Sequence, residues 1–215
     1  MHLLFDLDGT LTDSKPGILN CIQHAMASHG LPVPRQEDLG WCIGPPLRET
    51  LARLLGDDSH ELLEPVLVTY RERYGTVGLF ENELYPEIVE TLFALRDRGH
   101  TLHVATSKVE VYAKRIIDHF GLSEFFVSVN GSGMDGSRAN KAILIAHVLQ
   151  TQGIDPAEAV MIGDREHDMI GAKANSLPAI GALWGYGSGR ELMESGATLC
   201  ARVPHLLPEL IASLE

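Results

Sequence analysis

The chain has 215 residues, of which 45% are hydrophobic and 21% are charged, and this composition excludes a disordered or fibrous protein. Its formal net charge of −12 argues against nucleic-acid or membrane partners, because both need basic surfaces. The first residues show no signal peptide, and the three cysteines lie far apart, as is typical of reduced thiols. We therefore expect a cytoplasmic globular protein.

Short apolar runs recur along the chain and predict buried strands. The first covers residues 2–6, where His-Leu-Leu-Phe stops abruptly at an acid. Four further runs of this kind occupy 102–105, 125–129, 159–162 and 179–183. Between them, helical periodicity predicts helices over 86–98, 109–120 and 140–152. Strands that alternate with helices indicate an α/β fold, a doubly wound, Rossmann-like parallel sheet.

Residues 15–84 interrupt this alternation. They contain no convincing strand, and their periodicity predicts helices over 17–28, 45–55 and 60–74. A helical block inserted after the first strand of a parallel sheet indicates a second, smaller domain. We therefore expect an α/β core formed by 1–14 and 85–215, with an all-helical insertion over 15–84.

Chemically reactive residues cluster at the ends of the predicted strands. In an open parallel sheet, ligands bind beyond the carboxyl ends of the strands. The residues that sequence places at this edge are Asp6 and Asp8 after the first strand, Thr106 and Ser107 after the second, Lys141 at the start of the helix after the third, and Asp164 and Asp168 after the fourth.

This set of residue types predicts phosphoryl chemistry. Clustered carboxylates repel one another unless a cation lies among them, and Mg²⁺ is the cation that prefers oxygen ligands. One carboxylate can attack phosphorus, and a second can protonate the leaving oxygen and then activate water. Hydroxyl groups, backbone amides and a lysine can bind the phosphoryl oxygens. Together these parts make a phosphatase.

Four segments of the chain resemble the four motifs of the haloacid dehalogenase superfamily, in the same order. They are Asp6-Leu7-Asp8-Gly9-Thr10, Thr106-Ser107, Lys141, and Gly163-Asp164-Arg165-Glu166-His167-Asp168. The resemblance implies a Mg²⁺-dependent phosphate monoester hydrolase that forms an aspartyl-phosphate. It also implies that the helical insertion is a cap that closes over the site and excludes water.

The resemblance assigns roles to individual residues. Asp6 would be the nucleophile and a Mg²⁺ ligand, and Asp8 the general acid/base, whose backbone carbonyl reaches the metal. Asp164 would be the second carboxylate on Mg²⁺, and Asp168 would order the outer shell of the metal. The residues expected to bind the substrate or its phosphoryl group are Gly9, Thr106, Ser107, Lys108, Lys141 and, from the cap, Arg48.

Asp8 also separates the chemistries within the superfamily. The dehalogenases and the phosphonate-cleaving branch lack an acid at this position, so the resemblance favours phosphate esters. Segments 13–18 and 43–47 resemble a phosphoglycolate phosphatase-like branch whose members are also described as 5′-nucleotidases. A small phosphorylated metabolite is therefore the expected partner.

Two other functions stay open. A phosphomutase of the same architecture would return the phosphoryl group to its product, and a non-enzymatic protein would only bind phosphate compounds. The segment 131–136 fits the pattern GxGxxG, but the predicted helix begins only at about residue 140, too late for a dinucleotide site. We interpret this segment as a flexible loop that leads to Lys141.

Overall fold

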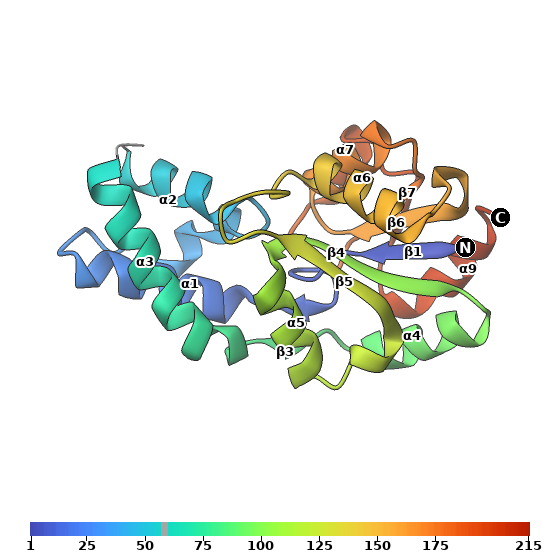
Figure 1. Cartoon of the computed structure of the whole chain (residues 1–215), viewed down its shortest axis with the longest axis horizontal. Helices are drawn as coiled ribbons and strands as arrows, with labels where there is room; N and C mark the ends of the chain where they lie inside the picture. The colour runs from blue at the N-terminus through green and yellow to red at the C-terminus, as the bar shows by residue number, and fades with distance from the viewer. Residues whose placement is uncertain (57–59) are drawn as a thin grey trace. The chain divides into compact units, whose positions relative to one another are not determined.

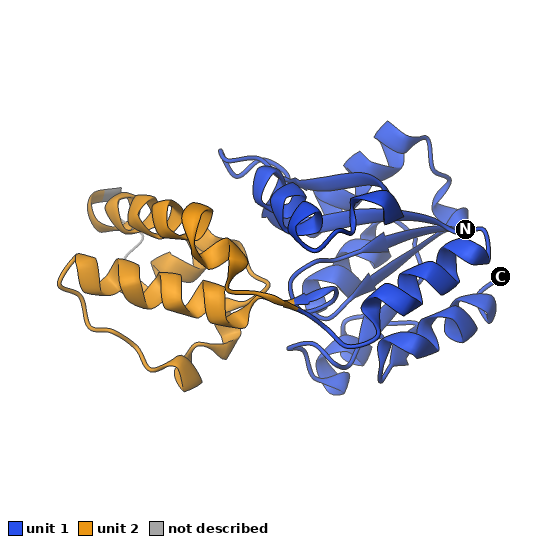
Figure 2. Cartoon of the chain, turned by 90° about the horizontal axis from the view of Figure 1, so that it is seen from below, with its two compact units in different colours: residues 1–12, 84–215 blue, residues 13–83 orange. Residues whose placement is uncertain are grey.

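The computed structural model describes residues 1–56 and 60–215, and these residues form two compact units. One unit combines Met1–Thr12 with Leu84–Glu215, and the other is Asp13–Glu83 (Figure 2). The sequence analysis places the two borders at 14/15 and 84/85, within two residues of these. Strands β2 (Thr12–Asp13) and β3 (Glu83–Leu84) form a two-stranded ribbon where the chain passes between the units.

Within the described residues, six strands of the larger unit form one sheet in the order β5-β4-β1-β6-β7-β8, and all its strand pairs are parallel. The strands are β1 (His2–Phe5), β4 (Thr101–Val109), β5 (Phe126–Ser132), β6 (Ala159–Gly163), β7 (Ala179–Ala182) and β8 (Leu199–Ala201). The central β1 pairs with β4 on one side and β6 on the other, so Leu4 lies opposite both His103 and Met161.

Helices cover both faces of this sheet. They are α4 (Ile88–Asp97), α5 (Glu110–His119), α6 (Lys141–Gln152), α7 (Glu166–Ala174), α8 (Gly189–Glu194) and α9 (Leu207–Ala212), with the short 3₁₀ helices η4 (Ser123–Phe125), η5 (Pro156–Glu158) and η6 (Pro204–Leu206). In Figure 1, α4 and α5 lie on one face and α6 and α7 on the other. This arrangement confirms the doubly wound α/β fold predicted from the sequence.

Burial in the core explains why the strand sequences are continuous runs of apolar residues. A parallel sheet with helices on both faces buries every residue of its central strands, so the side chains need not alternate between apolar and polar. Leu3, Leu4 and Phe5 of β1 are buried, as are all five residues of β6. Each of the large apolar side chains among them contributes about 1.5–3 kcal/mol when it leaves water. The chain therefore fixes the polar strand ends on a rigid, buried platform.

The smaller unit is helical. Its helices are α1 (Lys15–Ser28), α2 (Leu47–Leu55) and α3 (His60–Thr76), with 3₁₀ helices η1 (Gln36–Asp38), η2 (Gly40–Cys42) and η3 (Gly78–Phe80). Helix α1 packs against α3, and the rings of Tyr70 and Tyr74 stack with centroids 5.5 Å apart. The three helices predicted in this segment are present.

The structure differs from the sequence prediction at the second strand. The predicted strand ended at Ala105, whereas β4 continues to Val109 through Thr106 and Ser107. The register with β5 shifts between Ala105 and Val109, where Val109 pairs again with Ser132. This late pairing comes from a distant segment, so no local pattern signals it. No helix of the described residues is long and apolar enough to cross a membrane.

Candidate active site

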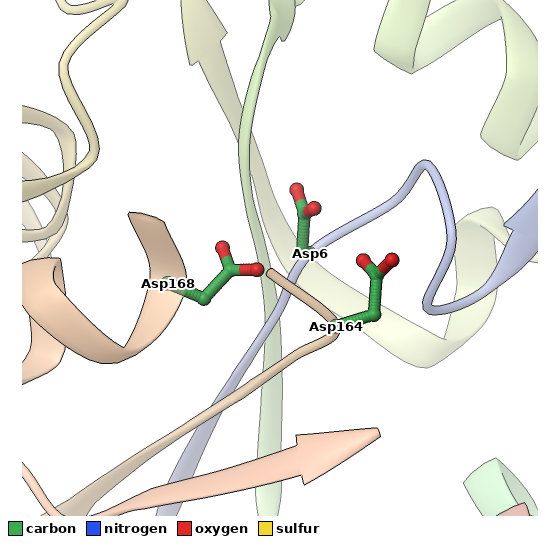
Figure 3. Close-up of side chains that lie close together, drawn as sticks. All are labelled: Asp6, Asp164 and Asp168. Carbon is green, nitrogen blue, oxygen red and sulfur yellow. The ribbon is translucent and has the colours of Figure 1, made fainter. Parts of the chain in front are cut away.

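Three buried aspartates meet at the carboxyl edge of the sheet. Asp6 directly follows β1, Asp164 directly follows β6, and Asp168 lies in the first turn of α7. Their carboxylates gather in one region (Figure 3), and one carboxylate oxygen from each lies within 4.8 Å of the others. Asp164 and Asp168 have no exposed surface and Asp6 is 6% exposed. The parallel sheet thus brings together the acids that the sequence placed at its strand ends.

Lys141 connects two of these aspartates. It is the first residue of α6, and its Nζ lies 2.8 Å from Asp6 Oδ1 and 2.7 Å from Asp168 Oδ1. It also donates a hydrogen bond to the carbonyl of Ala105, in β4, at 3.0 Å. Burial opposes the charge on Lys141, but Asp168 and Asp6 outweigh it and raise the pKa of the ammonium group above its usual value. Lys141 is therefore a fixed positive charge beside the predicted nucleophile.

Asp8 has a lysine partner of its own. Lys108 Nζ lies 2.6 Å from Asp8 Oδ2, and the two side chains are only 6% and 13% exposed. The other oxygen, Asp8 Oδ1, is buried and has no hydrogen-bond partner among the described residues. One oxygen of Asp8 is thus held by Lys108 while the other is available to accept or donate a proton.

Asp164 is held by hydrogen bonds from two separate segments. Thr10 Oγ1 donates to its Oδ1 at 3.2 Å, and the backbone amide of Tyr186 donates to its Oδ2 at 2.9 Å. Gly9 has φ +89°, a left-handed conformation, and a Cβ on it would lie 2.2 Å from Asp164 Oδ2. The Asp-Gly-Thr turn therefore approaches Asp164 as closely as only glycine permits.

The residues present fit a divalent cation. Four carboxylates and the two lysines Lys108 and Lys141 leave two formal negative charges uncompensated at the site. Burial, with the charges of Asp168 and Asp6, raises the pKa of Asp164 well above its usual value. Burial likewise raises the pKa of Asp168 to about 6, although Lys141 opposes this shift. A cation with oxygen-only ligands, of which Mg²⁺ is the typical example, would remove this repulsion.

The predicted phosphate-binding residues occupy the same edge. Thr106 is buried at 2% exposure, next to Ala105, whose carbonyl binds Lys141. The amide of Lys108 donates to Thr106 Oγ1 at 3.3 Å, within the stretch of β4 where the register with β5 shifts. Ser107 is half-buried between them. The Thr106 hydroxyl thus contacts the backbone of Lys108, and Thr106 directly follows the residue whose carbonyl binds Lys141.

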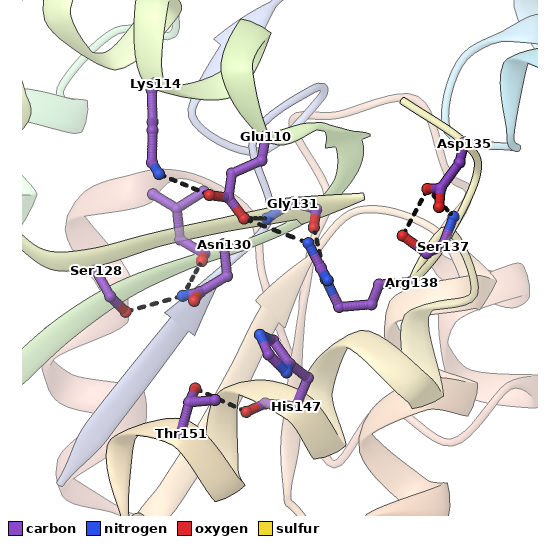
Figure 4. A network of polar contacts seen from close by, with 11 residues as sticks. Glu110, Lys114, Ser128, Asn130, Gly131, Asp135, Ser137, Arg138, His147 and Thr151 are labelled. Atoms are coloured by element: carbon purple, nitrogen blue, oxygen red, sulfur yellow. Dashed lines mark hydrogen bonds and ion pairs between the residues drawn. The ribbon is translucent and has the colours of Figure 1, made fainter. Parts of the chain in front are cut away.

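The segment 133–140 leads from β5 to the start of α6, whereas residues 131 and 132 of the predicted loop belong to the end of β5, where Ser132 pairs with Val109. Arg138 donates from Nε to the carbonyl of Gly131 at 3.2 Å, and its guanidinium lies 3.6 Å from Glu110 (Figure 4). Asn140 caps α6, since its side chain accepts hydrogen bonds from the amides of Ala142 and Ile143. These contacts set the point at which Lys141 enters the site.

Arg48 belongs to the smaller unit. It lies in the first turn of α2, where its guanidinium forms an ion pair with Glu64 of α3. In the same unit, the guanidinium carbon of Arg53 lies over the Trp41 ring, 4.0 Å from the ring centroid. The expected contact of Arg48 with a substrate stays a prediction.

Sequence reasoning missed the second segment that holds Asp164. Residues 184–187, Trp-Gly-Tyr-Gly, follow β7, and Trp184 donates from Nε1 to the carbonyl of Thr10 at 2.9 Å. This segment carries none of the acidic, hydroxyl or lysine side chains from which the site was predicted. Two glycines that flank an aromatic residue just after a predicted strand were the available signal, because they mark a close approach of the backbone.

The family is decided by comparison with known proteins. Residues 3–182 match the family model described as haloacid dehalogenase-like hydrolase, which covers most of the chain. The chain belongs to this hydrolase family. The matched range includes the three aspartates and Lys141 of the cluster described above.

Several relatives of the hydrolase have names that refer to phosphoryl chemistry. A protein of Pseudomonas aeruginosa named 5′-nucleotidase is 44% identical over 89% of this chain and 86% of its own length. A protein of Agrobacterium fabrum named phosphoglycolate phosphatase is 30% identical over 85% of this chain and 80% of its own. A protein of Mycobacterium tuberculosis named tyrosine-protein kinase PtkA is 41% identical, and the chain spans 62% of its length.

Solved structures agree with this assignment. A crystal structure described as a predicted phosphatase from Clostridium acetobutylicum superposes with a TM-score of 0.92, at 36% sequence identity and with 98% of both chains covered. The two-unit α/β architecture is therefore shared with proteins described as phosphatases.

Proposed function

We propose that this hydrolase cleaves phosphate monoesters in a Mg²⁺-dependent reaction that passes through an aspartyl-phosphate on Asp6. The observation that carries the proposal is the buried contact of Asp6 with Lys141, 2.8 Å away, inside a cluster with Asp164 and Asp168. A nucleophilic carboxylate needs a cationic neighbour, because the phosphoryl group that it attacks is itself negatively charged.

In the first step, the Asp6 carboxylate attacks phosphorus while the bond between phosphorus and the ester oxygen breaks. Asp8 gives a proton to the leaving oxygen, so the alcohol departs neutral. Because Lys108 occupies Asp8 Oδ2, we assign the transferred proton to Asp8 Oδ1, the oxygen without a partner among the described residues. Lys141 and the hydroxyl of Thr106 stabilise the charge on the phosphoryl oxygens.

In the second step, Asp8 takes a proton from water, and the water oxygen attacks phosphorus. The bond between phosphorus and the Asp6 carboxylate breaks, which releases inorganic phosphate and restores the free carboxylate. Asp6, Asp164 and the backbone carbonyl of Asp8 would hold Mg²⁺, which supplies charge neutralisation at the phosphoryl group.

A small phosphorylated metabolite is the proposed substrate. The relative named 5′-nucleotidase, at 44% identity, supports a nucleoside 5′-monophosphate, and the relative named phosphoglycolate phosphatase, at 30%, supports a phosphorylated small acid. The sequence comparison alone thus favours the nucleotide. The acidic site accepts either anion once its own charge is neutralised.

The test is phosphate release from phosphoglycolate, nucleoside monophosphates, sugar phosphates and p-nitrophenyl phosphate, with Mg²⁺ and with EDTA. We expect Mg²⁺-dependent release, with one substrate far ahead of the rest. Turnover that requires a sugar bisphosphate activator would replace the proposal with a phosphomutase. Binding without any release would replace it with a binding protein, and phosphoryl transfer from ATP to a tyrosine peptide would replace it with a kinase.

A further inference from the structure

The loop 184–187 makes direct hydrogen bonds to the candidate metal site, although it carries no acidic side chain. It follows β7 and reaches the site from the sheet position beyond β6. The amide of Tyr186 donates to Asp164 Oδ2 at 2.9 Å, so the loop itself orients the carboxylate. Each carboxylate oxygen can accept more than one contact, and Asp164 therefore keeps lone pairs for a cation.

The same loop also contacts the turn that follows Asp6. Trp184 donates from its indole Nε1 to the carbonyl of Thr10 at 2.9 Å, and Thr10 donates in turn from Oγ1 to Asp164 Oδ1 at 3.2 Å. Together with the amide of Tyr186, these contacts form a closed ring. It links the segment that bears Asp6 to the segment that bears Asp164.

Steric contacts show how tightly the loop is fitted to Asp164. A Cβ on Gly185 would lie 2.3 Å from Asp164 Cβ and 2.3 Å from the carbonyl oxygen of Gly9. A Cβ on Gly187 would lie 2.0 Å from the carbonyl oxygen of Asp164. Real Cβ atoms do not approach this closely, so the backbone of the loop packs directly against both segments.

We propose that the loop 184–187 is a positioning element for the divalent cation, in which Trp184 and the Tyr186 amide fix the separation of Asp6 and Asp164. The inference rests on the Mg²⁺ requirement of the proposed function, and it adds a loop that holds Asp164 and Thr10 through an amide and an indole donor. Groups that orient metal-binding carboxylates are worth about 10- to 100-fold in metal affinity when they are lost. The loop therefore sets how tightly the site binds Mg²⁺.

The experiment measures Mg²⁺ binding by isothermal titration calorimetry in the absence of any substrate. Trp184→Phe keeps an aromatic ring but removes the indole donor to Thr10, and we expect Mg²⁺ to bind about tenfold more weakly. Trp41→Phe is the matched control, because Trp41 belongs to the smaller unit and stacks with Arg53. It should bind Mg²⁺ like the wild type. Saturating Mg²⁺ should restore the turnover of Trp184→Phe, as a positioning role requires.

A second measurement leaves the loop unaltered, in case Trp184→Phe does not fold. The chain has two tryptophans, so Trp184 is the only indole in the Trp41→Phe protein. Saturating Mg²⁺ should change its fluorescence emission with the same midpoint as the calorimetric titration.

Each outcome separates the inference from the proposed function. Wild-type Mg²⁺ affinity in a folded Trp184→Phe protein, or an indole emission that does not respond to Mg²⁺, would overturn the inference and leave the phosphatase proposal standing. Weaker Mg²⁺ binding by Trp184→Phe, in a protein whose wild type releases no phosphate from any substrate, would support the inference while the proposed function fails.

Discussion

Each acid of the Asp6 and Asp8 pair has its own lysine. Lys141 contacts Asp6 and Asp168, and Lys108 forms an ion pair with Asp8. The two lysines therefore have separate effects on the proposed reaction. Lys141 balances the charge of the nucleophile, and Lys108 fixes the orientation of the acid that protonates the leaving group.

Replacement of Lys108 tests this division of roles. We expect Lys108→Met to slow the cleavage of alkyl phosphates by about 100-fold, because a loosely held Asp8 protonates a poor leaving group inefficiently. The loss should be much smaller for p-nitrophenyl phosphate, whose leaving group needs no proton. Steady-state rates for both substrates provide the measurement.

Lys114→Met is the matched control for Lys108→Met. Lys114 forms an exposed ion pair with Glu110 one helical turn away, so its loss should change neither rate. An equal loss on both substrates in Lys108→Met would contradict the positioning of Asp8 and would favour direct contact between Lys108 and the substrate.

At the scale of the element, α6 determines where Lys141 enters the site. The helix begins at Lys141, and the side chain of Asn140 accepts hydrogen bonds from the amides of Ala142 and Ile143 at 2.9 and 3.3 Å. These amides have no partner within the helix, so the cap both stabilises α6 and fixes its first residue.

Asn140→Ala should lower the free energy of unfolding by about 1 kcal/mol and should also reduce turnover, because the first turn of α6 carries Lys141. Urea denaturation and phosphate release measure the two effects. Asp155→Ala removes a comparable cap from η5, where Asp155 accepts from the amide of Ala157 at 2.9 Å. This control should lose stability without losing turnover, and an equal loss of turnover in both variants would contradict the role assigned to α6.

The elements show what the sequence could predict. The central strands and the helices of the smaller unit are each specified by local periodicity, and they were found where the pattern placed them. The strand β8, of only three residues, and the continuation of β4 to Val109 were missed, because both depend on pairing with distant segments. The loop 184–187 was missed for the same reason, since its contacts with Thr10 and Asp164 join segments far apart in sequence.

At the scale of the whole molecule, the acidic chain carries a neutral, buried histidine in its sheet. His103 of β4 is 1% exposed and lies 3.1 Å from His2 of β1 and 2.8 Å from Ser128 of β5. Burial, with a further contribution from His2, lowers the pKa of His103 to about 4. Protonation of this side chain is therefore strongly disfavoured in the folded state.

The contribution of His103 to the stability of the protein should fall as the pH falls from about 6.5 to 4. In this window the unfolded chain binds a proton at His103 and the folded chain does not, so the free energy of unfolding decreases by up to about 3 kcal/mol. Well above pH 6.5, from about pH 7.5, both states are neutral at His103 and the contribution is constant. Urea denaturation across this pH range provides the measurement.

His103→Gln removes the titrating group, so this variant should lose less stability than the wild type as the pH falls over the same range. His205→Gln is the control, because His205 is exposed and pairs with Glu87 at the surface. It should follow the wild-type profile. A His103→Gln profile as steep as the wild-type profile would assign the acid sensitivity to other groups.

The central claim is that Asp6 carries the phosphoryl group, and it can be tested directly. The wild-type protein is mixed with substrate and Mg²⁺, quenched in acid during turnover, digested and analysed by mass spectrometry. The account predicts the mass of one added phosphoryl group on the peptide that contains Asp6. For Asp6→Asn, the account predicts a native circular dichroism spectrum. It also predicts that this variant forms no phosphoryl adduct and does not turn over substrate. Full turnover by a folded Asp6→Asn protein, or a phosphoryl group on a different residue, would contradict the account.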